Sequence, residues 1–209
     1  MPLSQEALAS TDDKGGLILM TVTIRNALAP DYQPEALFAR VQAQPASDSE
    51  KSSRPQLLRF SILPSDRVGP GGRNAGRTYL LRFQFEPGQY RFMGLNISAG
   101  KFPVRGFGFL PIHADFAVPV GGNYYLGNVL GVNRRGLDGE FRTGPPTPKV
   151  DQVVTGLADG TFDVSVRDRF DTDLANYLAR FPELATRVID RLILPPIDRQ
   201  RAQLYWEEQ

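Results

Sequence analysis

The chain has 209 residues and a nearly balanced charge, with 24 Lys and Arg against 23 Asp and Glu. This length is sufficient to bury one large core, and the balanced charge argues against a general affinity for polyanions such as nucleic acid. With no Cys and a single His, the sequence excludes thiol catalysis, disulfides, thiolate metal sites and multi-histidine metal sites.

The first 15 residues are polar and are predicted to form a flexible tether. They lack the basic and apolar segments of an export signal, and no run in the chain reaches 18 apolar residues, the length of a membrane-spanning helix. From the sequence alone, the protein is either cytosolic or begins after a removed leader.

Alternating apolar residues predict half-buried strands from Gly16 onward. In the first run, four apolar side chains fall on one face: Ile18, Met20, Val22 and Ile24. Similar runs follow at 58–62, 79–85, 110–118, 123–132 and 162–166. Together they predict a mostly β fold, an antiparallel two-sheet sandwich of about seven or eight strands over residues 16–170.

Three stretches rich in Gly, Pro or Ser, at 45–56, 64–77 and 143–149, are predicted loops. Residues 35–42 fit a short helix and an edge strand equally, and the sequence leaves the two open. The turn Glu-Pro-Gly-Gln-Tyr at 86–90 predicts a tight connection, with Tyr90 at the start of the next strand.

The apolar spacing changes to three and four from Asp171, which predicts a helix capped by Asp171 and Thr172. Pro182 suits the first turn of a second helix, whose apolar stripe extends to Leu192 and is stopped by two prolines. A helical segment over 171–194 is therefore expected to pack on the sandwich, followed by a C-terminal tail at 195–209.

The segment Arg105-Gly106-Phe107-Gly108-Phe109 matches the opening of an RNA-recognition motif, in which strand aromatics stack on bases. Pro111 then interrupts the motif, because a proline removes a hydrogen bond from a central strand. The sequence favours a Gly-rich strand entrance in which Phe107 and Phe109 pack into the sandwich. RNA binding through this segment is the third hypothesis for function.

Other catalytic patterns are incomplete. Alternation places His113 on the polar side of its strand beside Asp115, which predicts a surface histidine whose change to Ala leaves the fold intact. The three aspartates Asp168, Asp171 and Asp173 are interpreted as helix caps. A hydrolase would need two carboxylates converging in a deep pocket. No motif for a cofactor or a metal is found, and none is predicted.

Three segments carry a resemblance to a known group of proteins: G-L-I-L-M-T-V-T at 16–23, F-E-P-G-Q-Y-R-F at 85–92, and F-A-V-P-V-G-G-N-Y-Y-L-G-N-V at 116–129. In this order they resemble uncharacterised bacterial cell-envelope proteins, often lipoproteins, with a prealbumin-like or carboxypeptidase-regulatory-like β-sandwich. Residues 168–182 are similar to the helical tail of those proteins. The resemblance covers most of residues 16–194.

This resemblance implies an exported protein of the periplasm or outer membrane, with any lipid anchor outside the present sequence. The leading hypothesis is a non-enzymatic binding or accessory module that contacts an envelope protein or glycan through sandwich loops. A carboxylate-dependent envelope hydrolase is the alternative. Candidate binding residues are Arg105, Phe107, Phe109 and Tyr125, and neither nucleic acid nor a transmembrane segment is expected.

Overall fold

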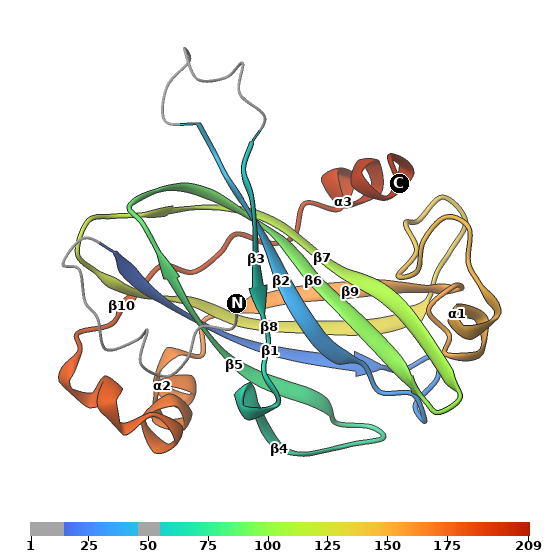
Figure 1. Ribbon diagram of the computed structural model, residues 1–209, viewed down its shortest axis with the longest axis horizontal. Helices are drawn as coiled ribbons and strands as arrows, with labels where there is room; N and C mark the ends of the chain where they lie inside the picture. Colours follow the sequence, from blue (N-terminus) through green and yellow to red (C-terminus); the bar gives the residue numbers. More distant parts are fainter. Residues whose placement is uncertain (1–14, 46–54) are drawn as a thin grey trace.

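The computed structural model describes residues 15–45 and 55–209, which form ten strands in two sheets and three α-helices (Figure 1). Sheet B has four antiparallel strands in the order β3, β2, β6 and β7. Their bounds are β2 Glu35–Ala43, β3 Leu57–Ser61, β6 Gly88–Lys101 and β7 Val104–Val118. Residues 35–42, which the sequence left open, are therefore a strand.

Sheet A has six strands in the order β10, β8, β1, β5 and β4, with β9 also paired to β8. Their bounds are β1 Gly16–Asn26, β4 Arg67–Gly72, β5 Gly76–Phe85, β8 Asn123–Arg135, β9 Gly160–Arg167 and β10 Asp190–Arg191. Strand β8 runs parallel to both β1 and β10. The mostly β, two-sheet prediction is confirmed, but sheet A is mixed rather than antiparallel and the strand count was too low.

The two sheets share one apolar core. Sheet A contributes Ile18, Met20, Val22 and Ile24, all fully buried on the face that the alternation predicted. Sheet B contributes the predicted inward side chains of β7, Leu110 to Val118 in alternation, to the same cluster. Aromatic rings meet between the sheets, as Phe83 and Phe92 do at 5.9 Å between centroids.

Strand β1 is buried on its second face as well. Leu17 and Leu19 pack with Leu80, Tyr125 and Tyr177 in a separate cluster beneath α2. A strand covered on both faces carries a nearly continuous apolar run, which is typical of strands with a parallel neighbour. The first strand was therefore correctly located, but the sequence predicted burial of one face only, whereas both faces are buried.

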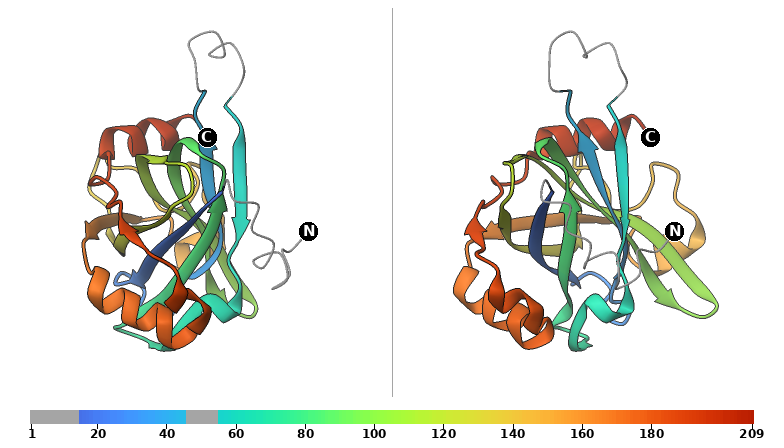
Figure 2. Two further views of the ribbon diagram at one scale, coloured as in Figure 1. Left: turned by 90° about the vertical axis from the view of Figure 1, so that its left-hand side faces the viewer. Right: turned by 60° about the vertical axis from the view of Figure 1, so that its left-hand side comes forward.

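The helices cover the outer faces of the sheets. Helix α2 (Phe170–Arg180) packs on sheet A, α1 (Val150–Val154) lies against β7, and α3 (Arg199–Glu207) lies on the opposite side of the molecule from α2 (Figures 1 and 2). In the described residues, no helix is long and apolar enough to cross a membrane. The predicted tether lies outside these residues except for Gly15, as does most of the 45–56 loop.

The expectations for the C-terminal region were partly wrong. A short 3-10 helix at Pro182–Thr186 is followed by β10, not by a helix that continues to Leu192. The backbone N–H groups of Leu192 and Leu194 donate to the carbonyl oxygens of Tyr125 and Leu126, so pairing with β8 prevails over the helical spacing. The predicted tail contains α3, whose first turn is capped by Asp198.

Asp173 connects α2 to sheet A rather than capping the helix. Its carboxylate is 3% exposed and accepts hydrogen bonds from the Tyr125 hydroxyl and the Asn128 amide. Asp171, two residues earlier, is exposed and pairs with Arg191 at 3.1 Å. The two aspartates of one helical turn therefore have different roles.

We expect Asp173→Ala to lower the free energy of unfolding by about 2 to 4 kcal/mol, because it leaves the buried Tyr125 hydroxyl and the partly buried Asn128 amide without their acceptor. The matched change Asp171→Ala should cost less than about 1 kcal/mol, as for other exposed ion pairs. Urea unfolding of both variants measures the difference. Equal losses would contradict the anchoring role of Asp173.

Candidate functional site

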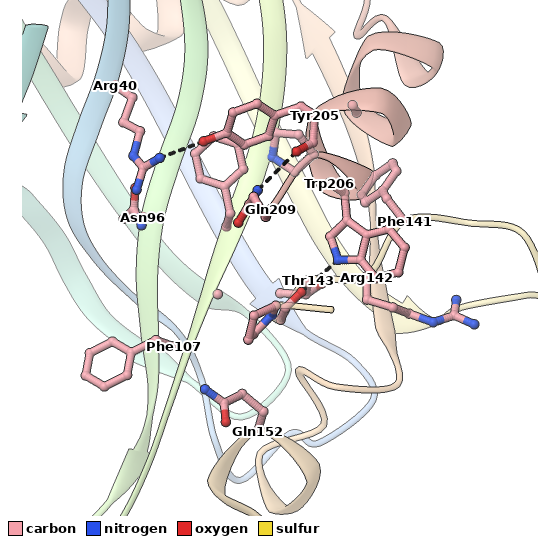
Figure 3. Close-up of a pocket in the computed structure, with 16 residues that line it drawn as sticks. Arg40, Asn96, Phe107, Phe141, Arg142, Thr143, Gln152, Tyr205, Trp206 and Gln209 are labelled. Atoms are coloured by element: carbon pink, nitrogen blue, oxygen red, sulfur yellow. Dashed lines mark hydrogen bonds between the residues drawn. The ribbon is translucent and has the colours of Figure 1, made fainter. Parts of the chain in front are cut away.

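An aromatic groove lies over the outer face of sheet B, between β7, residues 141–145 and α3 (Figure 3). Five aromatic side chains from three separate segments line it: Phe107, Phe109, Phe141, Tyr205 and Trp206. Its volume is about 190 Å³. Pockets for whole drug-sized ligands are larger, about 300 to 1,000 Å³, so this groove suits one ring-sized unit.

The wall formed by residues 141–145 is fixed by backbone contacts with β7. The N–H of Phe109 donates to the carbonyl of Thr143 at 2.8 Å. A Cβ atom on Gly108 would lie 2.8 Å from that same carbonyl oxygen, so only glycine permits this approach. The Thr143 hydroxyl also donates to buried Asn133 at 2.7 Å. The Gly-x-Gly spacing of this segment therefore has a structural cause.

Helix α3 forms the other wall and is held by side chains at both ends. The Trp206 indole donates to the Gly144 carbonyl at 2.9 Å, and Arg40 donates to the Tyr205 hydroxyl at 2.6 Å (Figure 3). Nearer its start, Arg201 pairs with Asp115 at 3.0 Å. These contacts hold the aromatic rings in place before any ligand arrives.

The polar lining of the groove is cationic or neutral. Arg40 and Arg142 are its charged residues, and Asn96 and Gln152 supply amides. Among the residues that the structure describes, the lining contains no Asp, Glu, His or Cys side chain. Such a surface offers ring faces for stacking and hydrogen-bond donors for oxygen atoms.

A second hollow adjoins the groove along β6 and β7. Phe107 lines the groove, whereas its cross-strand neighbour Ser98 lines the hollow together with Arg105 and Lys101. The hollow has a volume of about 430 Å³. It also includes Arg77, which pairs with Glu35 at 3.1 Å.

The four predicted binding residues separate into two groups. Phe107 is 49% exposed at the edge of the groove, and Arg105 is exposed beside it. Phe109 is half-buried, with the Tyr205 ring 5.3 Å away. The prediction that both Phe rings pack into the sandwich is wrong, because both point to its outer face. Tyr125 is 1% exposed and serves the fold through Asp173.

The three aspartates near the start of α2 do not line the groove. Asp168 and Asp171 share a shallow hollow at the start of α2, on sheet A. Both pair with Arg191, at 3.4 and 3.1 Å, and the Asp171 side chain is 90% exposed. Within residues 15–45 and 55–209, no cluster of three or more His, Cys, Asp or Glu side chains is placed to hold a metal ion.

Sequence reasoning missed Tyr205 and Trp206, because residues 195–209 were expected to form a tail. One signal was available. Asp198 after two prolines is a strong N-cap residue, and its side chain accepts from the N–H of Arg201 at 3.0 Å. That signal would have located the helix but not the sheet face on which it packs.

Comparison with protein-family models, with curated proteins and with solved structures gave no significant match to this chain. The resemblance to envelope β-sandwich proteins is therefore neither supported nor contradicted by these comparisons.

His113 is buried, which corrects the expectation of a surface histidine. Its side chain is 4% exposed beneath α3, with the Tyr205 ring 5.2 Å away. The residue has a φ of 49°, and the pairing of β6 with β7 shifts here because β7 contains an extra residue. The alternating side chains from Leu110 to Val118 still point into the core, so His113 lies on the outer face that the alternation predicted, and α3 covers it there. Its Nε2 atom has no hydrogen-bond partner among the described residues.

Burial, assisted by the nearby charge of Arg91, lowers the pKa of His113 from 6.5 to about 4. Above pH 6.5 the imidazole is neutral in both the folded and the unfolded chain, so its titration takes nothing from the stability of the fold. The free energy of unfolding decreases as the pH falls from 6.5 towards 4, because the unfolded chain binds the proton more tightly than the folded chain does. The difference between the two pKa values of His113 corresponds to about 3 kcal/mol of unfolding free energy.

We expect the wild-type protein to lose more stability than His113→Asn between pH 7 and pH 4. Asn tolerates a positive φ and does not titrate in this range, so the variant keeps the backbone and removes the proton linkage. Urea unfolding at several pH values measures the two slopes. Identical slopes would contradict a neutral, buried imidazole.

Proposed function

We propose that this protein is a non-enzymatic glycan-binding module that acts through the aromatic groove. The observation that carries the proposal is a ring-sized space lined by aromatic side chains, among which Phe107 is half-exposed and Tyr205 and Trp206 are partly exposed. The flat apolar face of a sugar ring packs well against aromatic rings, while its hydroxyl groups bond to amides and guanidinium groups. The lining of the groove combines aromatic rings with amide and guanidinium donors.

The rigidity of the groove supports binding as its role. Trp206 is fixed through Gly144, and Tyr205 is fixed through Arg40. Pre-positioned side chains lose little conformational entropy when a ligand binds, which increases affinity. A binding site on one sheet face differs from the sandwich loops expected from the sequence, although residues 141–145 do supply one wall.

The two alternative functions have less support. The described groove residues offer no pair of carboxylates for a glycosidase. For RNA binding, Phe107 is available for stacking, but the neighbouring ring of Phe109 is covered by Tyr205 and lies 5.6 Å from the Arg40 guanidinium. Stacking of successive bases needs more than one free ring.

We expect Phe107→Ala to abolish or weaken glycan binding at least tenfold on an array of purified bacterial envelope glycans. A half-exposed ring at the groove edge contributes contact area to a ligand and little to the core, so the melting temperature should change by only a few degrees. Leu57→Ala is the matched control, because Leu57 is 50% exposed on β3 of the same sheet and does not line the groove.

Loss of binding in Phe107→Ala with unchanged binding in Leu57→Ala would support the groove as the site. If the wild-type protein binds no glycan on the array, or if both variants bind as well as wild type, the proposed function is wrong.

We further propose that the protein acts in the cell envelope, on the basis of its resemblance to envelope proteins. The native gene product should then carry an export signal and should fractionate with the periplasm or outer membrane. Fractionation of untagged protein with N-terminal sequencing tests this. A cytosolic protein whose N-terminus is Met1 would contradict it.

A further inference from the structure

We propose that the glycan is acidic and chain-like, and that it runs from the aromatic groove across Phe107 into the second hollow lined by Ser98, Lys101 and Arg105. This inference rests on the proposed function and adds the charge of the ligand and its path. The separate observations that carry it are the adjacency of the two hollows along β6 and β7 and the charges that line them.

The two hollows meet along the pairing of β6 with β7. Phe107 lies opposite Ser98 in the register, and Arg105 lies opposite Gly100. The Arg105 guanidinium donates to the Ser98 hydroxyl at 3.3 Å and lies 5.6 Å from the centre of the Phe107 ring. Residues that line the two hollows are therefore direct neighbours, with Arg105 and Ser98 of the second hollow next to Phe107 of the groove.

The groove is large enough for one ring-sized unit only, so a ligand that fills it and has more units must leave along an open surface. The hollow at Arg105 has about twice the volume, 430 against 190 Å³. A linear oligosaccharide with one residue among the aromatic rings and the next residues over Phe107 fits this arrangement.

Positive charges exceed negative charges along this path. In the aromatic groove, Arg40 has no carboxylate partner within the described part of the chain. The guanidinium of Arg142 donates to the Leu137 carbonyl and points away from the other lining side chains (Figure 3). In the second hollow, Arg77 pairs with the single carboxylate of the lining, Glu35, which leaves Lys101 and Arg105 in excess. The nearby carboxylate of Asp151 accepts from the backbone N–H of Arg105 at 3.1 Å. A ligand with carboxylates would supply the missing counter-charges.

The test uses the single tryptophan of the protein, Trp206, which lines the groove and reports on its occupancy by fluorescence. The probes are hexagalacturonate and the same hexasaccharide with every carboxylate methyl-esterified. We expect the acidic form to bind at least tenfold more tightly at 50 mM salt, and this preference to decrease at 200 mM salt.

Two arginine variants test the path. Arg105→Ala should weaken hexagalacturonate binding about tenfold, the effect of one charge-assisted hydrogen bond, and should leave the ester unaffected. Arg59→Ala is the matched control, because Arg59 is also exposed and lies over a phenyl ring, that of Phe38 at 4.0 Å, but lines neither hollow. A nonspecific attraction between positive charges and the acidic sugar would weaken hexagalacturonate binding equally in both variants.

The outcomes separate this inference from the proposed function. If both forms of the hexasaccharide bind equally, or if Arg105→Ala and Arg59→Ala behave alike, the acidic path is wrong and the glycan site remains. If neither form changes the fluorescence of Trp206 and no glycan binds on the array, both proposals are wrong. Tighter binding of a uridine hexanucleotide that depends on Phe107 would overturn both proposals in favour of single-stranded nucleic acid.

Discussion

The approach of residues 141–145 to β7 at Gly108 is the contact on which the aromatic groove depends. Any side chain at position 108 would meet Thr143, and without that approach Gly144 would not be placed to accept from Trp206. The same loop is held from behind by Asn133, which also bonds to Asn26 at the end of β1. The groove is therefore tied to the core through buried amides, which are costly to leave unpaired.

The outer faces of the two sheets are used differently. Helix α2 covers sheet A through an apolar cluster that includes Tyr177, whose hydroxyl donates to the Leu81 carbonyl in the buried interface. Helix α3 covers only one end of sheet B, and several of its contacts there are polar. A helix that covers only part of a sheet leaves a concave boundary, which is the usual shape of a ligand site.

Alternation in the sequence was sufficient to locate most strands, because half-buried strands repeat with period two. It failed where a neighbour in space decided the outcome. Residues 187–194 have a helical spacing of apolar side chains, yet Val188 is 78% exposed and the chain pairs with β8. At His113 the face of the strand was predicted correctly, but α3 covers that face. Because residues 195–209 were expected to form a tail, neither the burial of His113 nor its contact with Tyr205 was predicted.

The distribution of charges around α3 also follows from physical chemistry. Where the helix begins, arginines meet carboxylates: Arg134 and Arg199 both bond to Glu140, and Arg134 in particular lowers the pKa of that carboxyl to about 2. In the hollow that Arg105 lines, Arg77 pairs with Glu35, whereas Lys101 and Arg105 form no side-chain ion pair among the described residues. Exposed cations cost the fold little, because water solvates them and surface ion pairs add little stability. Stability therefore does not require a partner for Lys101 or Arg105, and both cations stay available for a ligand.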